Sequence, residues 1–142
     1  MRNIFFYGLF MDQALLTAQG LHPTVIGKAV LPDYRIHIGA RATLLRSAGR
    51  HACGIVMALT DQDARTLYSE TSVRAYVPER VAVELMDTGE VIGADCYNLP
   101  DDADLTGTNP AYALQLLELA ETLQFDTAYV QEIATYANPS AD

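Results

Sequence analysis

The sequence predicts an α+β fold, with about six strands and four helices in a single domain over residues 1–137. Most of the chain consists of short apolar or alternating runs separated by Gly, Pro and Asp, which is typical of strands and turns. The last third changes to apolar residues at helical spacing. With 142 residues, of which 50% are hydrophobic and 19% charged, the chain is long and apolar enough to bury one core.

The elements of the first half follow from local signals. NIFFY (3–7) is apolar on both faces, which predicts a central strand. Asp12 is a suitable N-cap for a short helix over 13–19, and Gly20 is a suitable C-terminal stop. Four further strands are expected, of which the last two form a hairpin around Gly49: 24–31, 34–39, 42–47 and 51–59.

The second half adds a strand pair and three helices. Thr60 and Asp63 resemble a capping box, which predicts a helix through about Tyr68. Strands are expected over 76–86 and 91–99, joined by a turn at Asp87-Thr88-Gly89. Asn109 caps a helix over 110–123 with Pro110 at its first position, and Asp126 caps another over 127–137. Residues 138–142 are expected to form a disordered tail.

Composition narrows the classes of partner. The net charge of −9, from 18 acidic and 9 basic residues, argues against nucleic acid, because phosphate binding needs a basic surface. No run approaches the length of a membrane span, so no membrane partner is expected. Cys53 and Cys96 fit no disulfide or zinc pattern, which favours two reduced, buried thiols and a cytoplasmic location. The high apolar content is compatible with a homodimer.

The common catalytic motifs are absent from the sequence. It has no phosphate loop, no dinucleotide fingerprint, no GxSxG elbow and no HExxH. The three histidines share no ligand spacing, so we expect no metal and no cofactor. Arg41, Arg46, Arg50 and His51 gather around a predicted turn, where a solvated loop is favoured over an anion site.

The remaining candidates are carboxylates near strand ends. A single Glu can shuttle protons when a pocket positions it. Glu70 is the best placed, because it follows a helix, lies among small hydroxyl residues and precedes a strand. An ordinary surface role at a helix end is the competing interpretation, and the residues alone favour it. Glu79, Glu84 and Glu90 belong to alternating strand patterns and are expected to face solvent.

Taken together, these segments resemble the γ-glutamylcyclotransferase family, including its relatives similar to plant avirulence-induced proteins, over about residues 3–135. The resemblance lies in the order of several motifs, none of which is specific alone. They are Tyr7-Gly8 with Met11 after an apolar strand, Leu31-Pro32-Asp33-Tyr34, Gly54-Ile55-Val56, Leu67-Tyr68-Ser69-Glu70 followed by Tyr76 and a valine-rich strand, and Asn109-Pro110-Ala111-Tyr112 with Tyr129-Val130.

The resemblance implies a mixed β-barrel flanked by helices, and a lyase-type reaction without a cofactor. In that reaction the α-amine of a γ-glutamyl amide attacks its own γ-carbonyl, which releases an amine and 5-oxoproline. Glu70 falls on the family's catalytic glutamate and would serve as general acid and base. Glutathione and γ-glutamyl amino acids are the default substrates that the resemblance suggests.

The resemblance also implies a set of binding residues. The backbone of Gly8, Leu9 and Phe10 would hold the substrate's α-carboxylate, and Tyr7 belongs to the same loop. Tyr76, Tyr97 and Tyr112 match the family's pocket tyrosines.

The sequence also departs from the family pattern. Leu9-Phe10 replaces Ser-Asn or Thr-Leu, an expected acidic residue is Leu67, and no glycine follows Glu70. These departures keep two alternatives open: a non-catalytic module that binds a small ligand or regulates, and a hydrolase of γ-glutamyl compounds.

Overall fold

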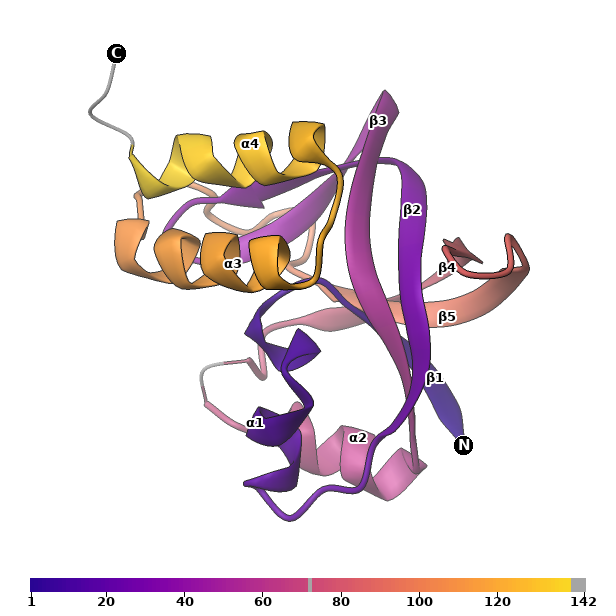
Figure 1. Cartoon of the computed structure of the whole chain (residues 1–142). Helices are drawn as coiled ribbons and strands as arrows, with labels where there is room; N and C mark the ends of the chain where they lie inside the picture. The colour runs from indigo at the N-terminus through magenta and orange to yellow at the C-terminus, as the bar shows by residue number, and fades with distance from the viewer. Residues whose placement is uncertain (72, 139–142) are drawn as a thin grey trace.

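The computed structural model of the chain describes residues 1–71 and 73–138. Its strands are β1 (Arg2–Phe6), β2 (Thr24–Ile38), β3 (Ala42–Leu59), β4 (Val77–Leu85) and β5 (Val91–Asn98). Within the described residues these five strands close into a barrel in the order β1-β3-β2-β4-β5 (Figure 1). Neighbouring strands are antiparallel except β1 and β5, which pair in parallel at Ile4 and Asp95 and close the barrel. The predicted mixed barrel is confirmed.

The long hairpin of β2 and β3 explains why the barrel has fewer strands than expected. The segments predicted as separate strands are joined, two in β2 and two in β3. The turn signals mark a bend inside this hairpin, because the pairing register shifts between Pro32 and Tyr34. Asp33 adopts a φ of 66° and Gly49 a φ of 80°, and the Gly49 N–H donates to the Asp33 carboxylate at 3.0 Å. The two irregularities therefore support each other.

Strand β1 runs through the core, as its apolar pattern predicts. Ile4, Phe5 and Phe6 are at most 3% exposed. Opposite them, Gly54 on β3 allows a close approach, since a Cβ there would lie 2.3 Å from the Phe6 carbonyl oxygen and 2.7 Å from the Phe5 ring. The end of β1 is thus fixed by tight packing just before Tyr7 and Gly8.

The helices begin at the predicted caps. Asp12, Thr60, Asn109 and Asp126 each accept a backbone N–H with their side chain. The Asp63 carboxylate accepts from the His22 N–H, at 3.1 Å, so the reciprocal half of the predicted capping box is replaced by a tertiary contact. The elements are the 3-10 helix η1 (Leu9–Met11), α1 (Gln13–Thr17), which is shorter than predicted, α2 (Asp61–Leu67), α3 (Pro110–Thr122) and α4 (Thr127–Ala137).

Two layers of helices flank the barrel (Figure 1). Helices α3 and α4 pack together across one side, while α1 and α2 lie toward the opposite end. The Lys28 ammonium donates to the Leu123 carbonyl at 2.8 Å, and the Tyr136 hydroxyl donates to the Ile36 carbonyl at 3.3 Å. These bonds fix the α3–α4 pair on β2. Among the described residues, no helix is long and apolar enough to cross a membrane. Apart from Asn138, the tail expected at 138–142 lies outside the described residues.

Candidate functional site

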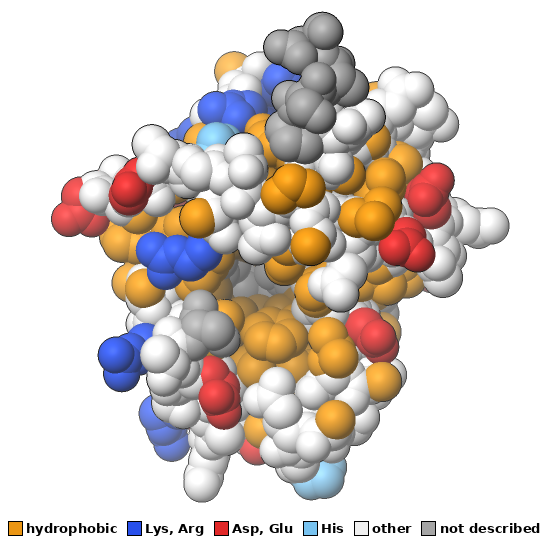
Figure 2. Space-filling view, turned by 90° about the vertical axis from the view of Figure 1, so that its left-hand side faces the viewer, with side chains coloured by type: hydrophobic (Ala, Val, Ile, Leu, Met, Phe, Trp, Pro, Cys, Tyr) orange, Lys and Arg blue, Asp and Glu red, His pale blue; other side chains and the backbone are white. Residues whose placement is uncertain are grey.

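A cavity of about 340 Å³ opens where several loops meet at the end of β1. Its size falls within the range of small-molecule pockets. Figure 2 shows a face of the molecule with a hollow whose visible walls are largely hydrophobic. The loop after β1, the β2–β3 turn, the segment between α2 and β4, the end of β5 and the start of α3 all contribute. The lining residues are Phe5, Phe6, Tyr7, Gly8, Leu9, Phe10, Leu15, Ala40, Arg41, Ala42, Tyr68, Val73, Tyr76, Tyr97, Asn109 and Tyr112.

The structure brings together all the binding residues that the sequence predicts. Tyr7 and the backbone loop after it come from β1, and Tyr97 from β5, which is paired with β1. Tyr76 immediately precedes β4, and Tyr112 lies in the first turn of α3. Residues that are far apart in the sequence therefore converge on one cavity, as the resemblance implies.

The tyrosines form a fixed aromatic wall. The Tyr7 hydroxyl donates to the Tyr97 carbonyl at 2.8 Å, and the rings of Tyr68 and Tyr97 stack with centroids 3.6 Å apart. On the far side of the wall, the Arg2 guanidinium donates to the Tyr97 hydroxyl at 2.8 Å. The Tyr97 ring is therefore held through both its face and its hydroxyl.

Gly8 is required by the position of Tyr112. Its φ of −107° lies in the extended region, so the backbone conformation does not demand glycine. A Cβ at this position would, however, lie 2.6 Å from the Tyr112 hydroxyl oxygen. The Leu9 backbone lies close enough to this hydroxyl to oppose the effect of burial, which raises the pKa of Tyr112. The absence of a side chain at Gly8 thus leaves the space that the Tyr112 hydroxyl occupies beside the loop after β1.

The loop after Gly8 presents backbone donors from an apolar frame. The rings of Phe6 and Phe10 meet edge to face with centroids 6.1 Å apart, which packs the loop onto β1. The N–H groups of Gly8 and Phe10 find no hydrogen-bond partner among residues 1–71 and 73–138. Unpaired backbone donors two residues apart in one loop suit a carboxylate.

Arg41 is a cavity residue that the sequence interpretation missed. It is exposed, as the predicted solvated loop requires, but from the β2–β3 turn it also lines the cavity. Its positive charge opposes the effect of burial, which raises the pKa of Tyr76. The Tyr76 hydroxyl donates to the Ala42 carbonyl and so ties the same turn to the cavity wall. Tyr68 and Asn109 were likewise not predicted as lining residues.

Glu70 lies outside the lining of the cavity. It follows α2 on an exposed turn, where its carbonyl accepts from the N–H groups of Val73 at 3.1 Å and Arg74 at 2.8 Å. Tyr68 and Val73, close to it on either side in the sequence, both line the cavity. The segment that carries Glu70 therefore borders the cavity, while its side chain is exposed to solvent.

Another carboxylate, Glu79, is less exposed than expected. It is half-buried on β4, where it accepts from the Tyr34 hydroxyl and from the Asn98 amide at 3.4 Å, and pairs with Arg46 at 3.2 Å. Burial and the bond to Glu79 raise the pKa of Tyr34 to about 12. This group lies away from the cavity lining, so it supplies no base there.

The chemistry of the cavity follows from its lining. Burial raises the pKa of Tyr7, Tyr68 and Tyr112, so these hydroxyls stay neutral at physiological pH. They can donate or accept hydrogen bonds but cannot act as bases. Among the described lining residues, Arg41 is the only charged group. The described lining thus combines neutral hydroxyls, one positive charge and apolar surface, and it contains no carboxylate.

Comparison with known proteins places this geometry in a family. The family model "Gamma-glutamyl cyclotransferase, AIG2-like" matches residues 4–121. The chain belongs to the γ-glutamyl cyclotransferase, AIG2-like family. The match includes every cavity-lining residue and Glu70. No curated protein matches the chain.

Solved structures show the same fold. A structure named γ-glutamyl cyclotransferase is 17% identical, with a TM-score of 0.78 over 95% of this chain and 87% of its own. An uncharacterized human protein is 18% identical, with a TM-score of 0.75 and the same coverage. YkqA from Bacillus subtilis is 20% identical, with a TM-score of 0.77 over 96% of this chain and 54% of its own. At this identity the likeness extends to the family's barrel and not to a particular substrate.

Proposed function

We propose that this family member cyclises a small γ-glutamyl amide to 5-oxoproline, with Glu70 as the general acid and base. The observation that carries the proposal is the convergence of Tyr7, Gly8 and the motif tyrosines on one cavity, at whose border the Glu70 segment lies. The nucleophile belongs to the substrate, so the reaction needs a shaped cavity and a proton carrier more than a reactive protein nucleophile.

The proposed reaction has balanced steps. The Glu70 carboxylate takes a proton from the substrate's α-ammonium, and the freed amine attacks the γ-carbonyl carbon to form the five-membered ring. The bond from that carbon to the leaving nitrogen then breaks as Glu70 returns the proton to that nitrogen. The ring nitrogen gives up its second proton to solvent, and the released amine takes one from solvent. The aromatic wall holds the substrate chain in the folded shape that ring closure requires. The Gly8 and Phe10 N–H groups bind the α-carboxylate.

Arg41 and the apolar lip extend the proposal to the substrate class. Leu9, Phe10 and Leu15 line the cavity, and Leu15 is 41% exposed at its edge. These side chains suit an apolar leaving amine. Arg41 lies on the β2–β3 turn and is suited to a second carboxylate. A γ-glutamyl amino acid with a large apolar side chain combines both features.

The first test is turnover by the Glu70→Gln variant. Purified protein is incubated with γ-glutamyl amino acids that differ in side-chain size, and 5-oxoproline is quantified. Loss of a positioned acid–base group typically costs about 10²- to 10⁴-fold in rate, so we expect a loss in this range with an unchanged thermal midpoint. Glu84→Gln, an exposed glutamate on β4, is the matched control. Wild-type turnover by Glu70→Gln would remove Glu70 from the mechanism.

The second test concerns Arg41. A hydrogen bond to a charged group contributes about 1.5–3 kcal/mol, so Arg41→Met should raise KM for γ-glutamyl amino acids roughly 10- to 100-fold. The matching γ-glutamyl amines, which lack the second carboxylate, should show little change. Arg65→Met on the exposed face of α2 controls for net charge. An equal rise in KM for both substrate types would contradict carboxylate binding by Arg41.

A binding module without turnover is the second candidate function. The exposure of Glu70 and the absence of a carboxylate among the described lining residues favour it. It predicts that γ-glutamyl compounds raise the thermal midpoint, while neither 5-oxoproline nor free glutamate forms. Free glutamate without 5-oxoproline would instead identify a hydrolase.

A further inference from the structure

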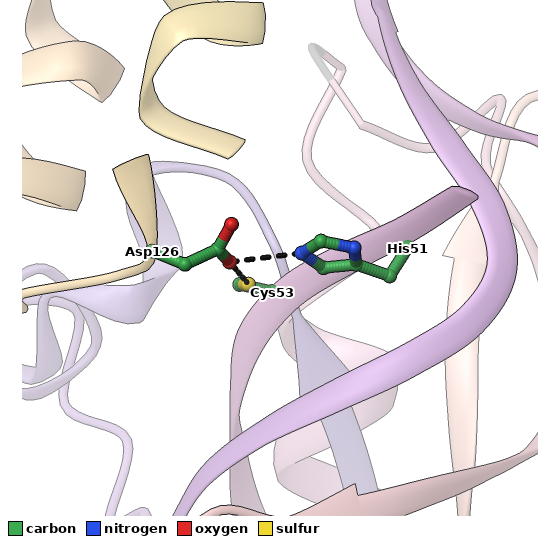
Figure 3. A group of neighbouring side chains, drawn as sticks. All are labelled: His51, Cys53 and Asp126. Carbon is green, nitrogen blue, oxygen red and sulfur yellow. Dashed lines mark hydrogen bonds and ion pairs between the residues drawn. The ribbon is translucent and has the colours of Figure 1, made fainter. Parts of the chain in front are cut away.

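A second group of chemically reactive side chains lies outside the cavity. His51 and Cys53 are alternate residues of β3, so both side chains point to the same face of the sheet. Asp126, the N-cap of α4, meets them there although it lies more than seventy residues further along the chain. Figure 3 shows the Asp126 carboxylate directed at both the imidazole and the thiol.

The distances within this group are short. The His51 Nε2 atom lies 2.8 Å from Asp126 Oδ1, and the Cys53 Sγ atom lies 3.4 Å from the same oxygen. One nitrogen, one sulfur and one oxygen all lie within 4.8 Å of one another. The Cys53 side chain is fully buried at the base of the group, whereas the side chains of His51 and Asp126 are 37% and 47% exposed. The group is therefore open to solvent on one side.

The surrounding structure holds Asp126 in place. Its Oδ2 accepts from the Tyr129 N–H at 3.2 Å, which is the capping bond of α4. Capping uses this oxygen and leaves Oδ1 directed at His51 and Cys53. The Tyr129 ring lies against the His51 imidazole with centroids 6.1 Å apart. The carboxylate and the imidazole are thus both positioned by contacts that do not use their ligand atoms.

Two simpler roles leave part of this arrangement unexplained. An ion pair between His51 and Asp126 needs no thiol beside the shared oxygen. A catalytic cysteine needs the imidazole next to the sulfur, but here the carboxylate bonds to both groups and the thiol is buried. Thiolate, imidazole and carboxylate are, by contrast, the three ligand types that zinc takes in proteins.

We propose that His51 Nε2, Cys53 Sγ and Asp126 Oδ1 form a Zn²⁺ site, with water in a fourth position. Tetrahedral zinc separates such ligand atoms by about 3.3–3.6 Å. The Sγ–Oδ1 distance already fits, and the Nε2–Oδ1 distance has to widen by about 0.5 Å. Binding releases the thiol proton to solvent, and the imidazole gives up the Nε2 proton that it donates to Asp126 and carries one on Nδ1 instead. Nε2 and Oδ1 then each bind the metal in place of the bond between them. The ion would fasten the start of α4 to β3.

The test uses the full chain, reduced and freed of metal with a chelator. Zn²⁺ is added in a calorimetric titration, with Mg²⁺ as a comparison. Co²⁺ then replaces Zn²⁺, because a thiolate ligand gives Co²⁺ a charge-transfer band in the near ultraviolet. The variants are His51→Gln, Cys53→Ala and Asp126→Asn, of which the last keeps an N-cap residue. Cys96→Ala removes the other buried cysteine, which lies outside the group, and is the matched control.

We expect one Zn²⁺ per chain, no Mg²⁺ uptake, and a thiolate–cobalt band that Cys96→Ala retains and Cys53→Ala loses. Loss of even an outer partner of a zinc ligand costs about 10- to 100-fold in affinity, so each ligand variant should weaken Zn²⁺ binding at least about 10-fold. Absence of saturable Zn²⁺ uptake by the wild-type chain would overturn the site. Unchanged Zn²⁺ affinity in folded His51→Gln and Asp126→Asn proteins, checked by circular dichroism, would overturn it equally.

Discussion

The contact between Gly8 and Tyr112 predicts a specific coupling between two substitutions. In Gly8→Ala the new Cβ meets the Tyr112 hydroxyl oxygen at 2.6 Å, so this oxygen must retreat by about 0.4 Å to reach 3.0 Å, the shortest separation that real Cβ atoms tolerate. Overpacking of this kind costs about 1–3 kcal/mol. In Tyr112→Phe the oxygen is gone, and the next atom of the ring, Cζ, lies at 3.9 Å, an ordinary contact.

The double-mutant cycle therefore has a definite expected outcome. Gly8→Ala should destabilise the wild-type chain by about 1–3 kcal/mol but be neutral, or stabilising by up to about 1 kcal/mol, in the Tyr112→Phe background, because alanine accepts the extended backbone. Urea unfolding of the four proteins measures the coupling in the free energy of unfolding. Tyr112→Phe alone should cost less than about 1 kcal/mol, because removal of the hydroxyl leaves the ring in place. Additivity within about 0.5 kcal/mol would refute the steric account of Gly8.

Two further predictions concern the core and the response to pH. Gly54→Ala should destabilise by about 3 kcal/mol or more, because its Cβ meets the Phe6 carbonyl oxygen, which the backbone fixes at 2.3 Å. In Gly93→Ala the new Cβ meets only the end of the exposed Arg80 side chain, which can move aside, so the cost should be less than about 1 kcal/mol. Urea unfolding measures both variants. Equal losses of unfolding free energy in Gly54→Ala and Gly93→Ala would contradict this difference between a backbone and a side-chain obstacle. The second prediction concerns stability at high pH. Burial raises the pKa of several tyrosines in the fold, and that of Tyr34 is raised to about 12. The fold therefore favours their neutral forms, and the stability this contributes is complete below pH 10 and decreases as the pH rises from 10 toward 12. Tyrosinate absorbance and circular dichroism should change together in this window, whereas free ionisation near pH 10 with the fold intact would contradict the burial.

The barrel was predictable from the sequence, except in the β2–β3 hairpin, where segments predicted as separate strands are continuous. The apolar run of β1 and the caps of α3 and α4 are local signals that tertiary structure left unchanged. Pro32-Asp33 and Gly49 are also local turn signals, but here they face each other in one hairpin. Their bond converts two predicted breaks into a bulge, so the expected short strands become β2 and β3. Turn residues in a sequence indicate an irregular backbone, but they do not show whether the two strands continue to pair beyond it.

Site residues were predictable where a motif carried them. Tyr7, Gly8 and Tyr112 belong to recognisable segments, and their contacts follow from the family's barrel. Arg41 has no motif, and it reaches the cavity lining from the turn between β2 and β3. The group of His51, Cys53 and Asp126 has no motif either, since its members come from a strand and a distant helix cap. A search by spacing finds metal ligands only when they are close in the sequence.

The apolar pair Leu9-Phe10 is the clearest departure from the family motif, and the structure changes its meaning. Phe10 packs on Phe6, so the loop is held by the core and needs no polar side chain to fix its shape. The proposed anion-binding role rests on backbone N–H groups, which are present whatever the side chain at positions 9 and 10. The substitution therefore leaves the geometry of the loop intact and changes the wall that a ligand touches. Substrate choice, more than loss of the site, is the expected consequence of Leu9-Phe10.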